Sequence, residues 1–169
     1  LLMRQIPIWN GDIVSGFVDL AREKAHVYRE GGASEVVPLT GDAAWQEKTA
    51  RFSMLETLAD HDDELMEQLL DDIPPPNDRV FDDLARELRE GFVCPVLMGV
   101  ATRTNGVLRL LKALRHEAAG VEETAARLGV KPNGEALALV LKTTHTTHGG
   151  KLSLVRVLSG EIGDGLTLN

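Results

Sequence analysis

The sequence predicts a mixed fold, α/β and α+β in class, that ends in the first strands of an antiparallel β-barrel or sandwich. Three observations support this prediction. Short strand-like segments separated by turns fill residues 1–41, and residues 42–91 show the period of helices. A nearly unbroken apolar run opens at Phe92 and leads into an amphipathic helix, as in half of a βαβ unit. Beyond residue 135, two strand-like segments flank a loop rich in Thr, His and Gly.

Short strands are expected in residues 1–41. Their apolar and β-branched composition suits a small sheet, and the pairs Asn10-Gly11 and Gly31-Gly32 supply turn signals between them. The expected strands are residues 5–9, 16–20, 25–28 and 35–38.

The next segment changes to a helical period. Asp42 can cap a first helix whose inward side would contain Trp45, Phe52, Leu55 and Ala59. This spacing predicts a helix, so residues 1–91 are expected to form a compact α+β unit.

Two further helices are expected before the apolar run. One can begin at Asp62 or Asp63, and a run of three prolines prevents its continuation. The next can begin at Asn77 or Asp78 and ends at Gly91. Their inward apolar residues are expected to be Leu65, Met66, Leu69, Leu70, Phe81, Leu84, Ala85 and Leu88.

The apolar run at residues 92–100 predicts a strand covered on both faces, with Cys94 inside it. Asn105 can cap the helix that follows. The apolar stripe of that helix consists of Val107, Leu110, Leu111, Leu114 and Ala118. Ligands of open α/β sheets bind beyond the carboxyl ends of strands, although many such turns bind nothing. The candidate ligand-binding residues are Gly99, Val100, Ala101 and Thr102.

Residues 119–169 predict a short helix, a turn and strands. Val121, Ala125 and Leu128 share one side of the helix, Gly129 ends it, and residues 131–134 form a turn or linker. Strands are expected at residues 136–144, 151–159 and 166–169. Two full strands and the start of a third cannot close a barrel, so we expect this chain to be a piece of a longer protein.

The net charge of −8 is concentrated in the middle of the chain. Residues 42–90 contain five basic and fifteen acidic side chains, whereas residues 91–169 are net basic. Such acidity attracts a basic partner and repels nucleic acid, and a solvated helical surface without a partner is the alternative. The single cysteine excludes an internal disulfide and favours the cytoplasm. No stretch approaches the roughly 18 apolar residues of a membrane span, so no membrane contact is expected.

No catalytic or metal-binding residue is assigned from the sequence. His145 and His148 could share a metal, but zinc sites normally have three or four ligands in a recognisable spacing. The adjacent carboxylates at residues 62–63, 71–72 and 82–83 are expected to be solvated and not to perform acid–base chemistry.

Several stretches, in order along nearly the whole chain, resemble bacterial elongation factor G and its relatives, which are translational GTPases. Residues 5–8 and 16–20 look like the opening of that family's insertion subdomain, and residues 63–67 resemble its "DELME" helix. Residues 95–101 are similar to its last guanine-nucleotide motif, and residues 150–160 look like the first strands of its second domain, a β-barrel.

The resemblance implies a division of the chain into four parts. Residues 1–91 would be the insertion subdomain of the GTPase domain, and residues 92–119 the last strand and helix of that P-loop domain. Residues 120–135 would be a linker, and residues 136–169 the start of the barrel domain.

The resemblance also implies GTP or GDP in the longer parent protein, with magnesium held by residues outside this chain. The phosphate-binding pattern G-x-x-x-x-G-K-[ST] is absent, since Lys151 is followed by Leu152, so the chain alone is expected to bind no cofactor and hydrolyse no GTP. The family usually has Ser-Ala after the glycine of the last motif. Val100 replaces that serine, which removes its hydroxyl bonds but leaves the backbone N–H of Ala101 for the base.

The partners implied are the ribosome, including the basic stalk protein of its large subunit, and rRNA through the barrel domain. The acidic residues expected to face the stalk protein are Glu47, Glu56, Asp60, Asp63, Glu64 and Glu67. The alternative is a stand-alone acidic protein-interaction module without a nucleotide function. Unpaired strand edges at residues 92–99 or 136–169 further predict self-association.

Overall fold

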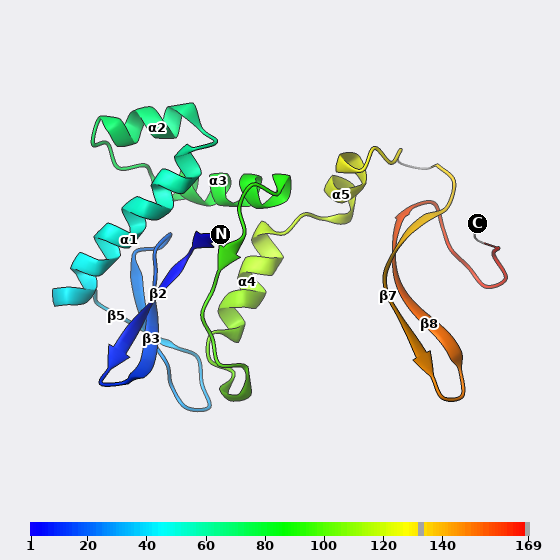
Figure 1. Ribbon diagram of the computed structural model, residues 1–169, viewed down its shortest axis with the longest axis horizontal. Helices are drawn as coiled ribbons and strands as arrows, with labels where there is room; N and C mark the ends of the chain where they lie inside the picture. The colour runs from blue at the N-terminus through cyan, green and yellow to red at the C-terminus, as the bar shows by residue number, and fades with distance from the viewer. Residues whose placement is uncertain (132–133, 168–169) are drawn as a thin grey trace. The chain divides into compact units, whose positions relative to one another are not determined.

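A computed structural model describes residues 1–131 and 134–167. The chain divides into two compact units, Leu1–Ala118 and Ala119–Asn169. The expected mixture of α/β and α+β structure is confirmed. The first unit combines helices with a small sheet, and the second consists of a short helix and an antiparallel strand pair (Figure 1).

An antiparallel sheet in the order β2-β3-β4-β5 forms the strand-rich part of the first unit. Its strands are β2 (Gln5–Asn10), β3 (Ile13–Asp19), β4 (Lys24–Val27) and β5 (Glu35–Val37), which confirms the expected positions. Phe17 on β3 is buried and stacks on His26 of β4, with ring centroids 4.9 Å apart. The buried residues of this sheet lie mostly on β3, where residues 16–19 form one buried run.

A second, very short pairing brings the start of the chain beside the apolar run. Strand β1 (Leu2–Met3) lies parallel to β6 (Pro95–Val96). The expectation of a long strand covered on both faces is wrong, because β1 is the ladder partner of β6 within the described residues and residues 97–100 form no strand there. Cys94 is accordingly exposed.

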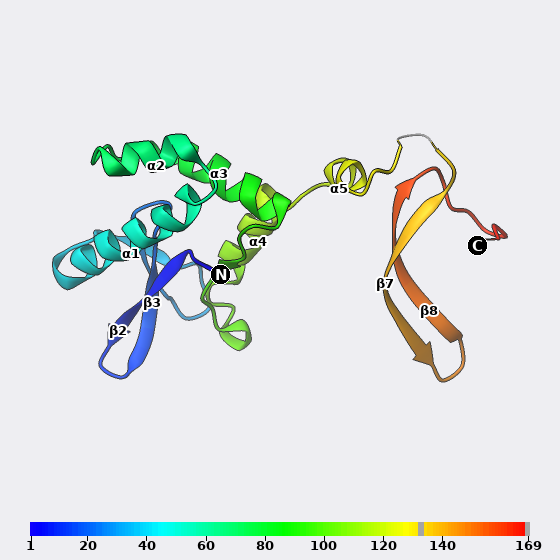
Figure 2. The same cartoon turned by 45° about the horizontal axis from the view of Figure 1, so that its top comes forward.

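Three helices gather at one end of the β2–β3 hairpin, whose turn points away from them (Figures 1 and 2). They are α1 (Gly41–Ala59), α2 (Asp63–Leu70) and α3 (Asn77–Glu90). Asp62 caps α2 as expected, since its carboxylate accepts a hydrogen bond from the Leu65 N–H at 2.9 Å. Gly91 ends α3 with a φ of 85°, a left-handed conformation that glycine adopts without strain.

The inward side of α1 differs from the expected one. Trp45 and Phe52 are 71% and 48% exposed. The buried residues of this helix are Glu47, Arg51, Met54, Leu55, Leu58 and Ala59. Two of them, Glu47 and Arg51, are charged. A prediction that considers apolar residues alone therefore does not find the side of α1 that faces the core. The core itself joins this side of α1 to Leu2, Leu20, Leu65, Val80, Leu84 and Val93.

The segment after β6 forms the 3₁₀-helix η1 (Ala101–Arg103) and then α4 (Val107–Glu117). The residue before α4 is Gly106 in a left-handed conformation, and not the expected Asn105. The apolar stripe of α4 is largely exposed within the described residues, at Leu110, Leu111 and Leu114.

The second unit begins with α5 (Val121–Arg127), which packs against the hairpin of β7 (Leu137–Thr146) and β8 (Gly150–Ser159). The hairpin confirms the two expected strands. The third is not formed at residues 166–167, and its last two residues lie outside the described part of the chain. The turn expected at residues 131–134 likewise includes positions 132–133, which are not described.

Candidate functional site

The expected ligand-binding residues form a tight loop between β6 and α4. The Val100 N–H donates to the Asn105 carbonyl at 2.9 Å, which closes the base of the loop. Inside it, the N–H groups of Arg103 and Thr104 donate to the carbonyls of Val100 and Ala101, both at 3.1 Å. The loop is therefore shaped by its own backbone and not by long side chains.

Two glycines allow the ends of this loop to approach each other. A Cβ on Gly106 would lie 2.3 Å from the Met98 carbonyl oxygen, and one on Gly99 would lie 2.7 Å from that of Asn105. Gly106 also has a φ of 76°, which a residue with a side chain adopts only with strain. The loop is anchored to the sheet by buried Gln5, whose Oε1 accepts a hydrogen bond from the Met98 N–H at 2.7 Å.

All four candidate residues of the loop, Gly99 to Thr102, are exposed. The backbone N–H groups of Ala101 and Thr102 have no acceptor within the described residues, because they precede the first bond of η1. A pocket of about 360 Å³ adjoins Ala101. Its lining is mostly apolar and includes Leu97, Met98, Ala101, Val107 and Leu110. The site can therefore offer an apolar wall and an amide donor to a flat ring that has a carbonyl group.

The six expected acidic residues do not all lie on one exposed surface. Glu47 is 6% exposed, and its burial, followed by the nearby Glu23 carboxylate, raises its pKa. Including Glu47 was wrong, since it belongs to the buried side of α1. The other five lie exposed on α1, at its end or on α2: Glu56, Asp60, Asp63, Glu64 and Glu67. Of these, Glu64 forms an ion pair with Arg79 at 2.8 Å.

Sequence reasoning missed two exposed aromatic residues on α1, the helix that also contains Glu56. Trp45 and Phe52 are seven residues apart on α1, so they lie on one side of the helix, two turns apart. Glu56 follows Phe52 by four residues on the same side. Aromatic side chains are enriched in the centres of protein interfaces. The helical spacing was visible in the sequence, but it was taken as a sign of burial.

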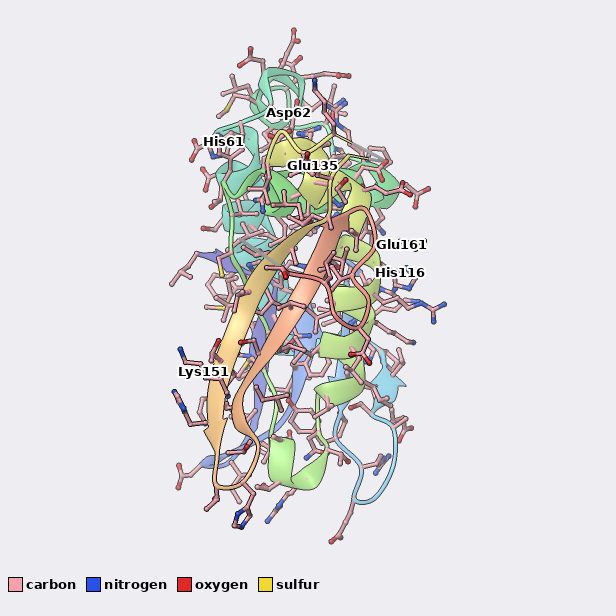
Figure 3. All side chains as sticks on the ribbon, turned by 90° about the vertical axis from the view of Figure 1, so that its right-hand side faces the viewer. His61, Asp62, His116, Glu135, Lys151 and Glu161 are labelled. Atoms are coloured by element: carbon pink, nitrogen blue, oxygen red, sulfur yellow. The ribbon has the colours of Figure 1, made fainter. Side chains whose placement is uncertain are left out.

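Asp62 lies at the junction of α1 and α2, next to His61 (Figure 3), and binds two arginines of α3. It accepts from Arg79 at 3.0 Å and from Arg86 at 3.1 Å. The bond from the Leu65 N–H, and then the two arginines, lower the pKa of Asp62 despite its partial burial. Asp83 is 2% exposed and pairs with Arg86 at 2.8 Å, and its burial raises its pKa. The prediction that this carboxylate is solvated is wrong.

The remaining chemical groups assemble no further site. His145 and His148 are exposed at the closed end of the β7–β8 hairpin. Within the described residues, no three His, Cys, Asp or Glu side chains are placed to hold a metal ion. None of the helices described there is long and apolar enough to cross a membrane.

Comparison with known proteins identifies similar chains. All of this chain aligns, at 39% identity, with an elongation factor G-like protein of the cyanobacterium Synechocystis sp. (strain ATCC 27184 / PCC 6803 / Kazusa). The match covers 25% of that protein, so the present chain spans about a quarter of its relative. A crystal structure from Thermus thermophilus matches with a TM-score of 0.72 and 23% identity, over 94% of this chain and 23% of the other. No family model matches the chain.

Proposed function

Because this chain is elongation-factor-G-like in sequence along its entire length, we propose that it forms part of a GTP-dependent translation factor that works on the ribosome in the cytoplasm. Residues 1–91 are its insertion subdomain, residues 92–119 end its GTPase domain, residues 120–135 are a linker, and residues 136–169 begin a barrel domain. GTP or GDP and its magnesium are held mainly by residues outside this chain. The chain itself supplies the loop for the guanine base and surfaces for the ribosome.

The unpaired N–H of Ala101 beside an apolar pocket is the observation that supports the guanine loop. A purine ring is flat and apolar on its faces, which suits the lining of the pocket. The guanine carbonyl accepts one hydrogen bond from a backbone N–H, and this bond needs no side chain. Val100 in place of serine is compatible with this role, because the Val100 side chain makes none of the bonds that close the loop.

The test removes that single N–H group in the longer protein that contains this chain. Ala101 is the first residue of η1, and Val100 before it is extended, so proline fits the backbone at position 101. We expect Ala101→Pro to weaken GTP binding about tenfold, the effect of one lost bond of about 1.4 kcal/mol. Ala101→Ser, which keeps the N–H, is the matched control and should bind GTP as before. If both variants bind GTP with equal affinity, the proposed hydrogen bond from the Ala101 N–H to the base is ruled out.

The surface of five acids and two aromatic residues supports a second contact, with the basic stalk protein of the large ribosomal subunit. It consists of Trp45, Phe52, Glu56, Asp60, Asp63, Glu64 and Glu67. The acids steer a basic partner over a distance, and the exposed aromatic rings bury apolar area on contact. Glu64 contributes less than the others, since Arg79 already compensates its charge.

A titration of the stalk protein's C-terminal domain against this chain tests the contact. We expect binding that weakens strongly between about 50 and 200 mM salt, because the exposed charges are screened. Glu56→Lys with Asp60→Lys should abolish it, whereas Glu135→Lys with Glu161→Lys, an equal charge change in the second unit, should not (Figure 3). Absence of binding at low salt would end this part of the proposal.

The β7–β8 hairpin is proposed to contact rRNA as part of the barrel domain. Lys142, Lys151 (labelled in Figure 3) and Arg156 are exposed on it and can contact phosphates. In the isolated chain, its open strand edges favour self-association, which light scattering across a concentration series measures. The alternative function, an acidic interaction module without a nucleotide role, is favoured if the longer protein binds the stalk protein but not GTP.

A further inference from the structure

A second pocket lies in the first unit between α3 and α4, apart from the guanine loop. Its volume is about 580 Å³, within the range of small-molecule sites. One wall is the side of α4 that contains Arg109, Lys112 and His116, and the other is the side of α3 that contains Arg86 and Arg89. The cationic residues that line it are Arg4, Arg22, Arg86, Arg89, Arg109 and Lys112. This concentration of positive charge occurs in a chain whose net charge is −8.

The internal partners of Arg4, Arg86 and Arg109 use only part of each guanidinium group. Arg4 binds Glu117 Oε2 through Nη1 at 2.8 Å, and its Nε is buried without a partner in the described structure. Arg109 binds Asp19 through Nε and Nη2, and Arg86 reaches Asp62 and Asp83 through Nη2 alone. Since a guanidinium has five N–H donors, these arginines are held in place and still have donors to offer.

Arg22 and Lys112 have no carboxylate partner within the described residues, unlike Arg4, Arg86 and Arg109. The guanidinium of Arg22 lies 5.6 Å from the centroid of the Phe81 ring, a cation–π contact that leaves its charge uncompensated. Both side chains are exposed. Two acids of α3, Asp82 and Glu90, also line the pocket and disfavour an anion there. An anion must therefore engage several donors at once.

We propose that this pocket binds the phosphate groups of a phosphorylated small molecule of about nucleotide size, with Arg22 and Lys112 as its main contacts. Arginine forks match the oxygens of a phosphate in geometry as well as charge, and several can share one polyphosphate. A single chloride or carboxylate has too few acceptors for this arrangement. The pocket suits a compact ligand because it is an open hollow of limited volume between two helices.

Calorimetry of the 169-residue chain with inorganic tripolyphosphate, at low ionic strength, tests the proposal. We expect saturable binding at one site, with a Kd below about 1 mM. Arg22→Gln with Lys112→Gln should weaken it at least about tenfold, because the two uncompensated charges are removed. Lys48→Gln with Lys131→Gln, which removes the same charge from exposed positions outside the pocket, should leave the Kd unchanged. Asp82→Asn with Glu90→Gln should tighten binding, since the two repelling acids are gone.

Absence of saturable binding would overturn the proposal, and so would an equal loss in the pocket variant and in the Lys48 and Lys131 variant. ATP and GTP form the second arm of the experiment. Tighter binding of either than of tripolyphosphate identifies a nucleotide as the ligand, and equal binding identifies the phosphate groups alone, so both outcomes support the site. Tripolyphosphate has no base, so a failure of the guanine loop at Ala101 leaves this measurement unaffected.

Discussion

The two units of the molecule differ in where their apolar side chains lie. Within the described residues, every buried hydrophobic side chain belongs to residues 1–118 except Ala125. The hairpin strands β7 and β8 are rich in Leu and Val, yet the one buried residue in them is Ser159. Leu139, Leu152 and Leu154 are 43%, 64% and 63% exposed.

This contrast separates two sources of structure. The first unit is held by a core that brings distant parts of the chain together. The hairpin is held by its ladder of backbone hydrogen bonds and by cross-strand pairs such as Thr143 with Ser153, whose hydroxyls are 2.8 Å apart. A two-stranded hairpin of this kind is marginal in water without further packing. A composition rich in Leu and Val is therefore enough to define these strands, but not to supply a core.

The largest expected effect on stability is found by truncating one leucine to alanine in each unit and comparing the two variants. Leu58 is fully buried on α1, so Leu58→Ala should lower the free energy of unfolding by about 3 kcal/mol, the sum of lost burial and a cavity. Leu152→Ala on the exposed hairpin should change it by less than about 0.5 kcal/mol. Urea denaturation followed by circular dichroism measures both. Equal losses would mean that the hairpin is as well packed as the core.

The second prediction concerns Glu87 of the first unit, an ionisable side chain whose pKa is raised by burial. Glu87 is fully buried on α3, its carboxylate has no hydrogen-bond donor in the described structure, and burial raises its pKa to about 7. The folded state thus holds this proton more tightly than the unfolded chain. The stabilisation is complete below the unfolded pKa near 4.5 and is lost as the pH rises through about 7.

Glu87→Gln should remove this loss and stabilise the protein at pH 8 by on the order of 2 kcal/mol, with little change at pH 4. Asp82→Asn, at an exposed position of the same helix, is the control and should leave the pH profile unaltered. Unfolding curves at several pH values provide the measurement. A wild-type profile that is flat between pH 5 and 8 would show that Glu87 ionises normally.

The smallest effect compares two glycines in left-handed conformations. Gly106 has a φ of 76° and no space for a Cβ, whereas Gly150 of the hairpin has a φ of 70° and no atom within 4 Å of that position. Gly150→Ala should cost about 1 kcal/mol for conformation alone. Gly106→Ala should cost about 1 kcal/mol more, because the Met98 carbonyl must also move. Thermal melts of the two variants measure the difference, and equal shifts would mean that the loop relaxes freely.

Much of the fold could be predicted because it depends on local signals. Asp62 and Gly91 mark helix ends by their own chemistry, and the two hairpin strands are rich in Leu and Val and flank a loop rich in Thr, His and Gly. What could not be predicted depends on distant partners. Arg51 is buried on α1 because its guanidinium donates to the Leu20 carbonyl and to Asn77, which no local pattern reveals.

The candidate site shows the same division. Gly99 to Thr102 were placed correctly in a loop after a strand, because a strand, a turn and a helix follow one another along the chain. Glu47 was misassigned, since exposure of an acid was assumed from its charge. The basic pocket was not predicted at all. Its residues come from the segment after β1, a turn, α3 and α4, and only the packing of α3 against α4 brings them together.

The parallel pairing of Leu2 with Pro95 has a consequence for the order of folding. The pairing of these two short strands closes a chain loop of more than ninety residues. Closing this loop costs conformational entropy, and the four-residue ladder stabilises the structure only after the loop is closed. Helices α1 to α3 and the β2–β3 hairpin are made of near-neighbour contacts and need no such closure. We therefore expect them to form first, with the β1–β6 contact among the last native interactions, so that mutations at Leu2 should accelerate unfolding and leave the folding rate nearly unchanged.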